Sequence, residues 1–202
     1  MKLATLALAL GLTSPAFADT TVTVDFEKTW DYGQMVDDSY AASGISFTNV
    51  MGLSNGDGLG PLVDGSYYAG APSLLGVGFV QLDGDINTTS YMNVAAGAAG
   101  ALSFFYSAPT DVALAIKAYS GLNGTGTLLG TINLTANSND YTAWTQAVLS
   151  FSGVAHSFDL TGAANVVGLD NLTISAVPEP TSLAMLLAGS ALLAATARRR
   201  RG

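Results

Sequence analysis

The sequence contains no cysteine, and its central part contains very few positive charges. Without cysteine, the chain can form no disulfide, no zinc–thiolate site and no thiolate nucleophile. Fourteen of the 15 acidic residues lie between residues 19 and 176. Only two of the seven basic residues, Lys28 and Lys117, lie in this range, so this body has a formal charge of −12. Contacts with a phosphate backbone need Lys and Arg, so nucleic-acid binding is excluded.

Histidine is also nearly absent. His156 is the single histidine, and in the period-two pattern it shares a face with Val154, Phe158 and Leu160, so we expect a half-buried structural imidazole. One histidine cannot build a histidine-rich metal site. The stretch Gly52-Leu53-Ser54-Asn55-Gly56 matches G-x-S-x-G, but the Gly and Pro residues that follow prevent the helix that a nucleophile elbow requires. We interpret this stretch as a glycine-rich loop.

The N-terminal residues 1–18 have the features of a secretory signal peptide. Lys2 precedes an apolar run at residues 3–12, and the stretch ends on Ala16-Phe17-Ala18, an Ala-x-Ala cleavage site. Cleavage by signal peptidase after Ala18 would leave Asp19 as the first residue. The apolar run is too short for a spanning helix, which needs about 20 residues.

The C-terminal residues 177–202 combine a short motif, an apolar segment and a basic tail. Val177-Pro178-Glu179-Pro180 is followed by an apolar stretch at residues 181–197 and by a tail at residues 198–202 that contains Arg198, Arg199, Arg200 and Arg201. Seventeen residues at ~1.5 Å each form about 25 Å of helix, slightly less than a ~30 Å hydrocarbon core, and the arginines can snorkel to compensate. We expect a transmembrane helix whose C-terminus is cytoplasmic.

This order closely resembles the PEP-CTERM sorting signal of Gram-negative bacterial envelope proteins. The resemblance implies that an exosortase, an integral membrane protease-like enzyme, recognises the motif and that cleavage releases or transfers the body. Pro178 and Pro180 hold the approach to the helix extended, which suits an active site in the membrane. We therefore expect a body that is first tethered to the inner membrane in the periplasm and then reaches the cell surface or medium. A plain C-terminal anchor is the alternative.

The body, residues 19–176, is typical of an all-β protein. Apolar residues alternate with polar ones, as at Val22, Val24 and Phe26, and no amphipathic helix is evident. We expect strands at residues 21–27, 44–50, 77–82, 101–107, 112–119, 127–134, 146–151, 154–160 and 166–175. These predict an antiparallel β-sandwich, jelly-roll-like in its connections.

Four local features refine the prediction for the body. Residues 95–100, an Ala/Gly run, are expected to form a loop. Ser152-Gly153 predicts the two-residue turn of a hairpin. A change in apolar parity near Asp170-Asn171 predicts a bulge in the last strand. The only candidate linker is the stretch from Ser175 to Thr181.

The body also resembles the carbohydrate-binding-like β-sandwiches common among PEP-CTERM proteins, through residues 124–129, 151–155 and 168–172. In such folds, acids of the first strand often meet an Asp of the last strand at a structural Ca²⁺, which implies Asp25, Glu27 and Asp170 as ligands here. Carboxylate and carbonyl oxygens are what Ca²⁺ prefers. Solvated surface acids are the alternative. Asp83-Gly84-Asp85-Ile86-Asn87 departs from an EF-hand at Thr88 and Val94 and is interpreted as an acidic turn.

The leading hypothesis is a non-enzymatic, exported protein of the biofilm matrix or exopolysaccharide that acts structurally or by weak carbohydrate contact, with no cofactor except a possible structural Ca²⁺. Seven aromatic residues could line a sugar site: Trp30, Tyr32, Tyr40, Tyr67, Tyr68, Tyr91 and Trp144. The alternative is an envelope polysaccharide hydrolase, which would need two converging carboxylates or a Ser–His contact. An ice-binding face would need regularly spaced threonines, which the sequence does not clearly provide.

Overall fold

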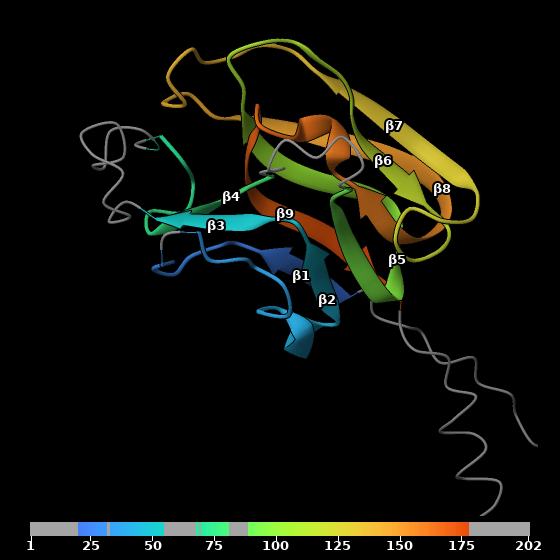
Figure 1. The fold of residues 1–202 in the computed structure, drawn as a ribbon. Coiled ribbons are helices and arrows are strands. Elements are labelled where there is room, and N and C mark those ends of the chain that lie inside the picture. The colour runs from blue at the N-terminus through green and yellow to red at the C-terminus, as the bar shows by residue number, and fades with distance from the viewer. Residues whose placement is uncertain (1–19, 32, 55–67, 69, 81–88, 178–202) are drawn as a thin grey trace, which may run out of the picture.

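The computed structural model describes residues 20–31, 33–54, 68, 70–80 and 89–177 (Figure 1). These residues form antiparallel strands in one hydrogen-bonded sheet of order β3-β4-β9-β5-β8-β6-β7, with β1 paired to β9 and β2 to β5. The elements are β1 (Thr20–Val24), η1 (Ala41–Ser43), β2 (Ile45–Thr48), β3 (Met51–Ser54), β4 (Gly76–Phe79), β5 (Tyr91–Ser107), β6 (Val112–Tyr119), β7 (Leu128–Leu134), β8 (Thr145–Asp159), η2 (Thr161–Ala163) and β9 (Gly168–Ala176). The predicted all-β antiparallel class is confirmed.

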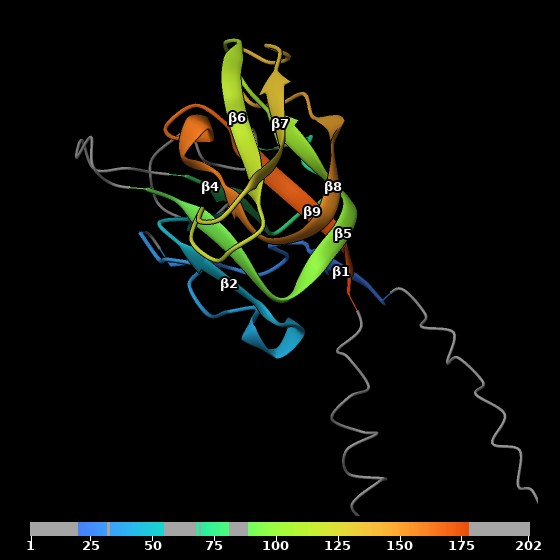
Figure 2. The ribbon, with the colours of Figure 1, turned by 90° about the vertical axis from the view of Figure 1, so that its right-hand side faces the viewer.

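The sheet folds over because its two longest strands bend. In β5, residues 91–94 pair with β2, whereas residues 98–107 pair with β9. The pairing of β5 with β8 is irregular between these two parts. The two halves of the sheet thereby lie face to face, as Figures 1 and 2 show, and the body is a β-sandwich. The larger of the two buried hydrophobic clusters in the described part includes Phe26, Met92, Phe104, Ile116, Phe158 and Leu172. The jelly-roll connectivity stays a prediction.

The Ala/Gly run at residues 95–100 is not a loop, so that prediction was wrong. These residues lie inside β5, where Gly97 and Gly100 have φ values of +84° and +80°. A Cβ atom on Gly97 would lie 2.4 Å from Cγ1 of Val154 on the neighbouring strand β8. Glycine is therefore needed here for a bend and a close approach within a strand.

The predicted hairpin turn at Ser152-Gly153 was also wrong, because β8 continues through it. Ala99 pairs with Val154 and Ala101 with Ser150, so three residues of β8 stand opposite one residue of β5. Gly153 has a φ of +90°. The turn residues thus mark a bulge that bends a long strand.

Two further strands contain bulges, one predicted and one not. In β9, Asp170 pairs with Phe105 of β5 and Thr173 pairs with Ser103, so two residues of β9 stand opposite one residue of β5. The predicted bulge at Asp170-Asn171 is therefore confirmed. In β6, Leu114 has a φ of +50° and is 48% exposed, although in a regular strand it would share the inward face of the buried Val112. Its bulge shifts the parity of the strand, and Ala115 is buried in its place.

The first and last described residues lie at the same end of the sandwich. β1 and β9 are antiparallel, with Thr20 opposite Ala176 (Figure 2). The predicted signal peptide, its cleavage site at Ala18 and Asp19, the transmembrane segment at 181–197, the arginine tail and the turn at 83–87 all lie outside the described residues. Within the described ranges, no helix is long and apolar enough to cross a membrane.

Candidate functional site

The body holds the chain up to the first residue of the predicted sorting motif. β9 ends at Ala176, which pairs with Ala98 of β5 on one side and with Thr20 of β1 on the other. Val177 then donates its backbone N–H to the carbonyl oxygen of Gly97, at 2.9 Å. The predicted linker is therefore wrong for its first residues, 175–177, and residues 178–181 lie outside the described part.

Asp170, one of the predicted calcium ligands, is fully buried at the bulge of β9. Its Oδ2 atom accepts a hydrogen bond from the Ser73 N–H and its Oδ1 atom one from the Asn171 N–H, both at 2.7 Å. Burial raises the pKa of Asp170 to about 6 although these hydrogen bonds lower it, and the charge of Glu27 adds to the rise. A buried carboxylate therefore fixes the loop before β4 to the last strand.

The other two predicted ligands lie in the same region. Oδ1 of Asp25 accepts a hydrogen bond from the Tyr40 hydroxyl at 3.3 Å, and Oε1 of Glu27 accepts one from the Leu75 N–H at 3.2 Å. Burial, followed by the charge of Asp25, raises the pKa of Tyr40 above its usual value, and the charge of Asp170 contributes to this rise. The fold thus brings the three acids into one electrostatic environment.

Calcium binding at these acids remains a prediction. Among the described residues, no group of three or more His, Cys, Asp or Glu side chains is arranged to hold a metal ion. If Ca²⁺ binds the native body, a free Ca²⁺ concentration of about 100 times the dissociation constant adds about 2.7 kcal/mol to the free energy of unfolding. Thermal melting with Ca²⁺ and with EDTA measures this, and identical midpoints would contradict the prediction.

We expect Asp170 to make the body less stable as the pH rises in metal-free buffer. Its pKa is about 6 in the folded chain, above the ~3.9 of an unfolded Asp. The folded state therefore binds more protons between these values, and the free energy of unfolding falls by up to about 3 kcal/mol from pH 4 to pH 6 and then levels off.

Asp170→Asn should remove this pH dependence and lose one of the two carboxyl oxygens that accept hydrogen bonds, at a cost of about 1–3 kcal/mol at pH 4. Urea denaturation in EDTA from pH 4 to pH 7 measures both effects. Asp38→Asn, which changes an exposed carboxylate, is the control and should keep the slope. The same slope in Asp170→Asn as in the native chain would contradict the prediction.

The predicted features of a hydrolase are separated in the fold. Ser54 lies in β3 rather than in the expected loop, and its hydroxyl donates to the carbonyl oxygen of Trp30 at 3.0 Å. His156 in β8 is half-buried, as predicted, and its Nδ1 lies 3.3 Å from the carbonyl oxygen of Val94. Three strands, β4, β9 and β5, stand between β3 and β8 in the sheet.

Part of the predicted aromatic site is not available to a ligand. Trp30 and Tyr68 are buried, so these two predictions were wrong. Tyr40, Tyr91 and Trp144 are partly exposed, and Tyr32 and Tyr67 lie outside the described residues. Trp30 is covered because Gly52 and Gly76 leave room for its ring, a contact that the sequence does not reveal.

The outer face of β5, β8 and β6 carries a row of groups that the sequence analysis did not assemble. Tyr91 stands opposite Asp159, which stands opposite Lys117, and the Lys117 Nζ lies 3.1 Å from Oδ2 of Asp159. In the adjacent row, Tyr119 stands opposite Ser157 and is partly exposed. The sequence did contain a signal for the exposure of Tyr119. Residues two apart in a regular strand share a face, so Tyr119 was expected on the same solvent-facing side as Lys117.

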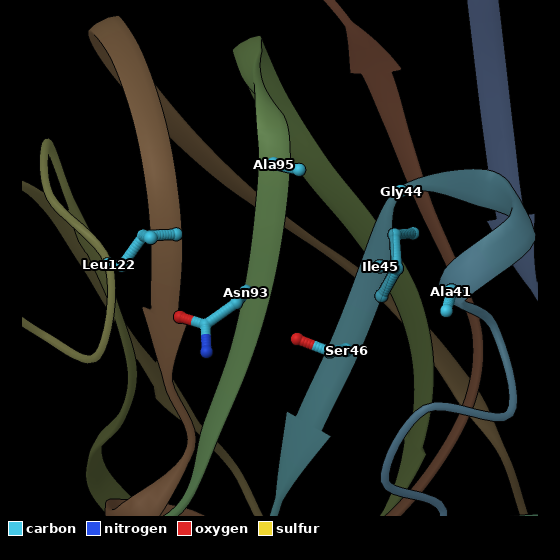
Figure 3. Close-up of a pocket in the computed structure, with 7 residues that line it drawn as sticks. All are labelled: Ala41, Gly44, Ile45, Ser46, Asn93, Ala95 and Leu122. Carbon is cyan, nitrogen blue, oxygen red and sulfur yellow. The ribbon is translucent and has the colours of Figure 1, made fainter.

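A groove of about 270 Å³ lies beside this face (Figure 3). In Figure 3, Leu122 and Ala41 lie on either side of Asn93 and Ser46. The Asn93 amide exchanges two hydrogen bonds of 2.8 Å with Asn123 and thereby fixes the loop after β6. The lining is Ala41, Gly44, Ile45, Ser46, Asn93, Ala95 and Leu122, without a charged or aromatic side chain. Such a lining offers no surface on which a sugar ring could stack.

Comparison with known proteins identifies the C-terminal end. Residues 176–201 match the PEP-CTERM protein-sorting motif, and this match begins at the last residue of β9. No curated protein matches the chain.

Solved structures similar to the body include an adhesin domain of Lys-gingipain from Porphyromonas gingivalis, with a TM-score of 0.47 and 14% identity over 79% of this chain and 99% of that one. They also include a family 6 carbohydrate-binding module with a TM-score of 0.41 and 16% identity over 74% and 98%, respectively. CsCBM6-3 from Clostridium stercorarium, solved with cellobiose, has a TM-score of 0.36 and 18% identity over 52% and 78%. No ligand or activity of this chain follows from these scores.

Proposed function

We propose that this chain is an exported, non-enzymatic protein that its C-terminal signal sorts to the cell surface or the surrounding matrix. The observation that carries the proposal is the junction at Ala176, where the folded body ends and the PEP-CTERM motif begins. A complete folded domain joined directly to a sorting signal is what a displayed or released protein requires.

In this proposal the C-terminal segment is a temporary tether. Signal peptidase removes residues 1–18, the apolar residues 181–197 hold the precursor in the inner membrane, and the body lies in the periplasm. An exosortase-type enzyme then recognises the motif at residues 177–180. Cleavage there would also remove Arg198–Arg201 and leave a body with almost no positive charge.

The body would serve the exopolysaccharide matrix through the outer face of β5, β8 and β6. Support comes from two partly exposed tyrosines, Tyr91 and Tyr119, on either side of β8. Beside them, in the row of Tyr91, the Lys117–Asp159 pair supplies hydrogen-bond donors and acceptors. Sugar rings bind to such sites by stacking on an aromatic ring while polar groups bond the hydroxyls, and the tyrosines provide large apolar area at a small entropic cost.

Affinity electrophoresis in gels that contain the bacterium's own exopolysaccharide tests this role of the body. Tyr91→Ala and Tyr119→Ala should each weaken retardation by about fivefold or more, because truncation of a central interface tyrosine costs over about 1 kcal/mol. Leu114→Ala, which truncates an exposed β6 residue, is the matched control and should migrate like the native body. Equal retardation of all variants would contradict the proposed face, and release of reducing sugar by the native body would favour the hydrolase.

A further inference from the structure

We propose that the end of the body from which the sorting tail departs is a membrane-facing surface, which rests on the lipid headgroups while the tail is still attached. This tail-side end consists of β1, the bends of β5 and β8, and the end of β9 with Val177 (residues 20–24, 95–103, 148–156 and 173–177). The proposal rests on the tether described above and adds the part of the body that the membrane contacts.

The first argument is the length of chain between the body and the membrane. β9 is paired on both sides at Ala176, and Val177 is still bonded to Gly97. Four residues, 177–180, separate Ala176 from the apolar segment that begins at Thr181. Fully extended, they reach about 13 Å, roughly twice the ~5–7 Å headgroup layer between body and hydrocarbon. The tail-side end is therefore held within about 6–8 Å of the headgroups, close enough to rest on them.

The second argument is charge. The four ranges of the tail-side end contain no Asp, Glu, Lys or Arg, although the body as a whole has a formal charge of −12. Asp25 lies beyond the far end of β1, about 17 Å along the strand from Thr20, and Asp170 is about 20 Å from Ala176 along β9. Because the Debye length is about 8 Å at physiological salt, these acids are largely screened from the headgroups. Signal cleavage would add Asp19 and an α-amino group, whose charges cancel.

The third argument is the chemistry of the surface. A shallow hollow of about 490 Å³ on the tail-side end is lined by small and apolar residues, Ala99, Gly100, Ala101 and Ile174, and by the hydroxyl residues Thr21, Ser103, Thr173 and Ser175. Such hydroxyls both donate and accept hydrogen bonds, as contacts with phosphate and glycerol oxygens require. Val148 and Val154, on the adjacent part of β8, are 51% and 38% exposed and add apolar area for the interface.

The absence of cysteine allows a direct test with single labels. Ser152→Cys places a probe on the exposed bulge of β8, and Thr110→Cys places one beyond the opposite end of β5. Each labelled chain from Asp19 to Gly202 is reconstituted in vesicles of phosphatidylglycerol and phosphatidylethanolamine that carry a headgroup nitroxide. We expect at least about threefold stronger quenching at position 152 than at 110, because nitroxide quenching needs near contact and the strands separate the two ends by about 25 Å. Equal quenching would overturn the proposal.

Charge variants and flotation separate the possible failures. Ala99→Glu with Val154→Glu should reduce quenching at position 152, whereas Ala113→Glu with Ala136→Glu, on exposed sites elsewhere, should not. If quenching requires a co-reconstituted exosortase-type enzyme, the surface fits that enzyme instead and the lipid proposal is wrong. A chain that fails to float with the vesicles would refute the tether itself, whereas a floating chain without quenching would refute only the membrane-facing surface.

Discussion

Replacing Pro178, Glu179 and Pro180 together by alanine is expected to leave the protein uncleaved and attached to the membrane. The sequence predicts that the two prolines keep the motif extended, and alanine would then allow the predicted apolar helix to extend back to the body. We expect the processed fraction to fall about tenfold or more, because the loss of only about 1.4 kcal/mol of transition-state stabilisation slows a step tenfold. Immunoblots of membrane and medium fractions measure the processed fraction.

The matched control for this prediction lies immediately after the motif. Thr181→Ala with Ser182→Ala removes two polar side chains from the start of the apolar segment but keeps the motif intact. This variant should be processed like the native chain. Normal processing of the triple alanine variant would contradict recognition through the motif, and failure of both variants would point to the apolar segment instead.

Replacing Gly52 by valine is expected to destabilise the body by about 3 kcal/mol or more, as severe overpacking of a core does. A Cβ atom on Gly52 would lie 1.9 Å from Cδ2 of Trp30, inside the contact distance of any two carbon atoms. The Trp30 ring is only 1% exposed, and its Nε1–H donates to the Phe26 carbonyl oxygen at 3.1 Å. The ring can therefore not move aside without losing this bond and its packing.

Urea denaturation followed by tryptophan fluorescence measures the stability of the Gly52→Val variant. Ala113→Val, which adds bulk at an exposed position of β6, is the control and should change the free energy of unfolding by less than about 0.5 kcal/mol. A Gly52→Val body within 1 kcal/mol of the native one would show that the contact of β3 with Trp30 is looser than its geometry implies.

The sequence predicts the class of the fold because alternation is a local property. Of the alternating residues Val22, Val24 and Phe26, the last two are fully buried and Val22 is partly buried against the core. The bends were predicted wrongly because glycine permits the same positive φ in a turn and in a bulge. Whether Gly97 or Gly153 ends a strand depends on the partner strand, which local sequence does not specify.

The candidate sites could be predicted only in part, for the same reason. The C-terminal signal is contiguous in sequence, and the motif match at residues 176–201 confirms it. The acids Asp25, Glu27 and Asp170 were grouped by resemblance, but the donation of the Ser73 N–H to Asp170 joins residues 97 positions apart. Such contacts depend on the tertiary fold, as does the burial of Trp30.

The junction at Ala176 also changes how the tail can act. With Val177 bonded to the body, a processing enzyme cannot bind residues before Pro178 in an extended cleft unless the end of β9 separates from β5 and β1. In the proposed function, the body and the motif would therefore reach the enzyme as one unit, with the tail-side end as the part of the body closest to it.

Mass spectrometry of the C-terminus of the mature protein, isolated from the cell surface or the medium, tests the central claim most directly. Sorting by cleavage predicts a C-terminal peptide that ends at or near the motif of residues 177–180 and lacks the apolar segment and all four terminal arginines. A mature, envelope-exposed protein that still ends in Arg201-Gly202 would contradict the claim and would make the tail a permanent anchor.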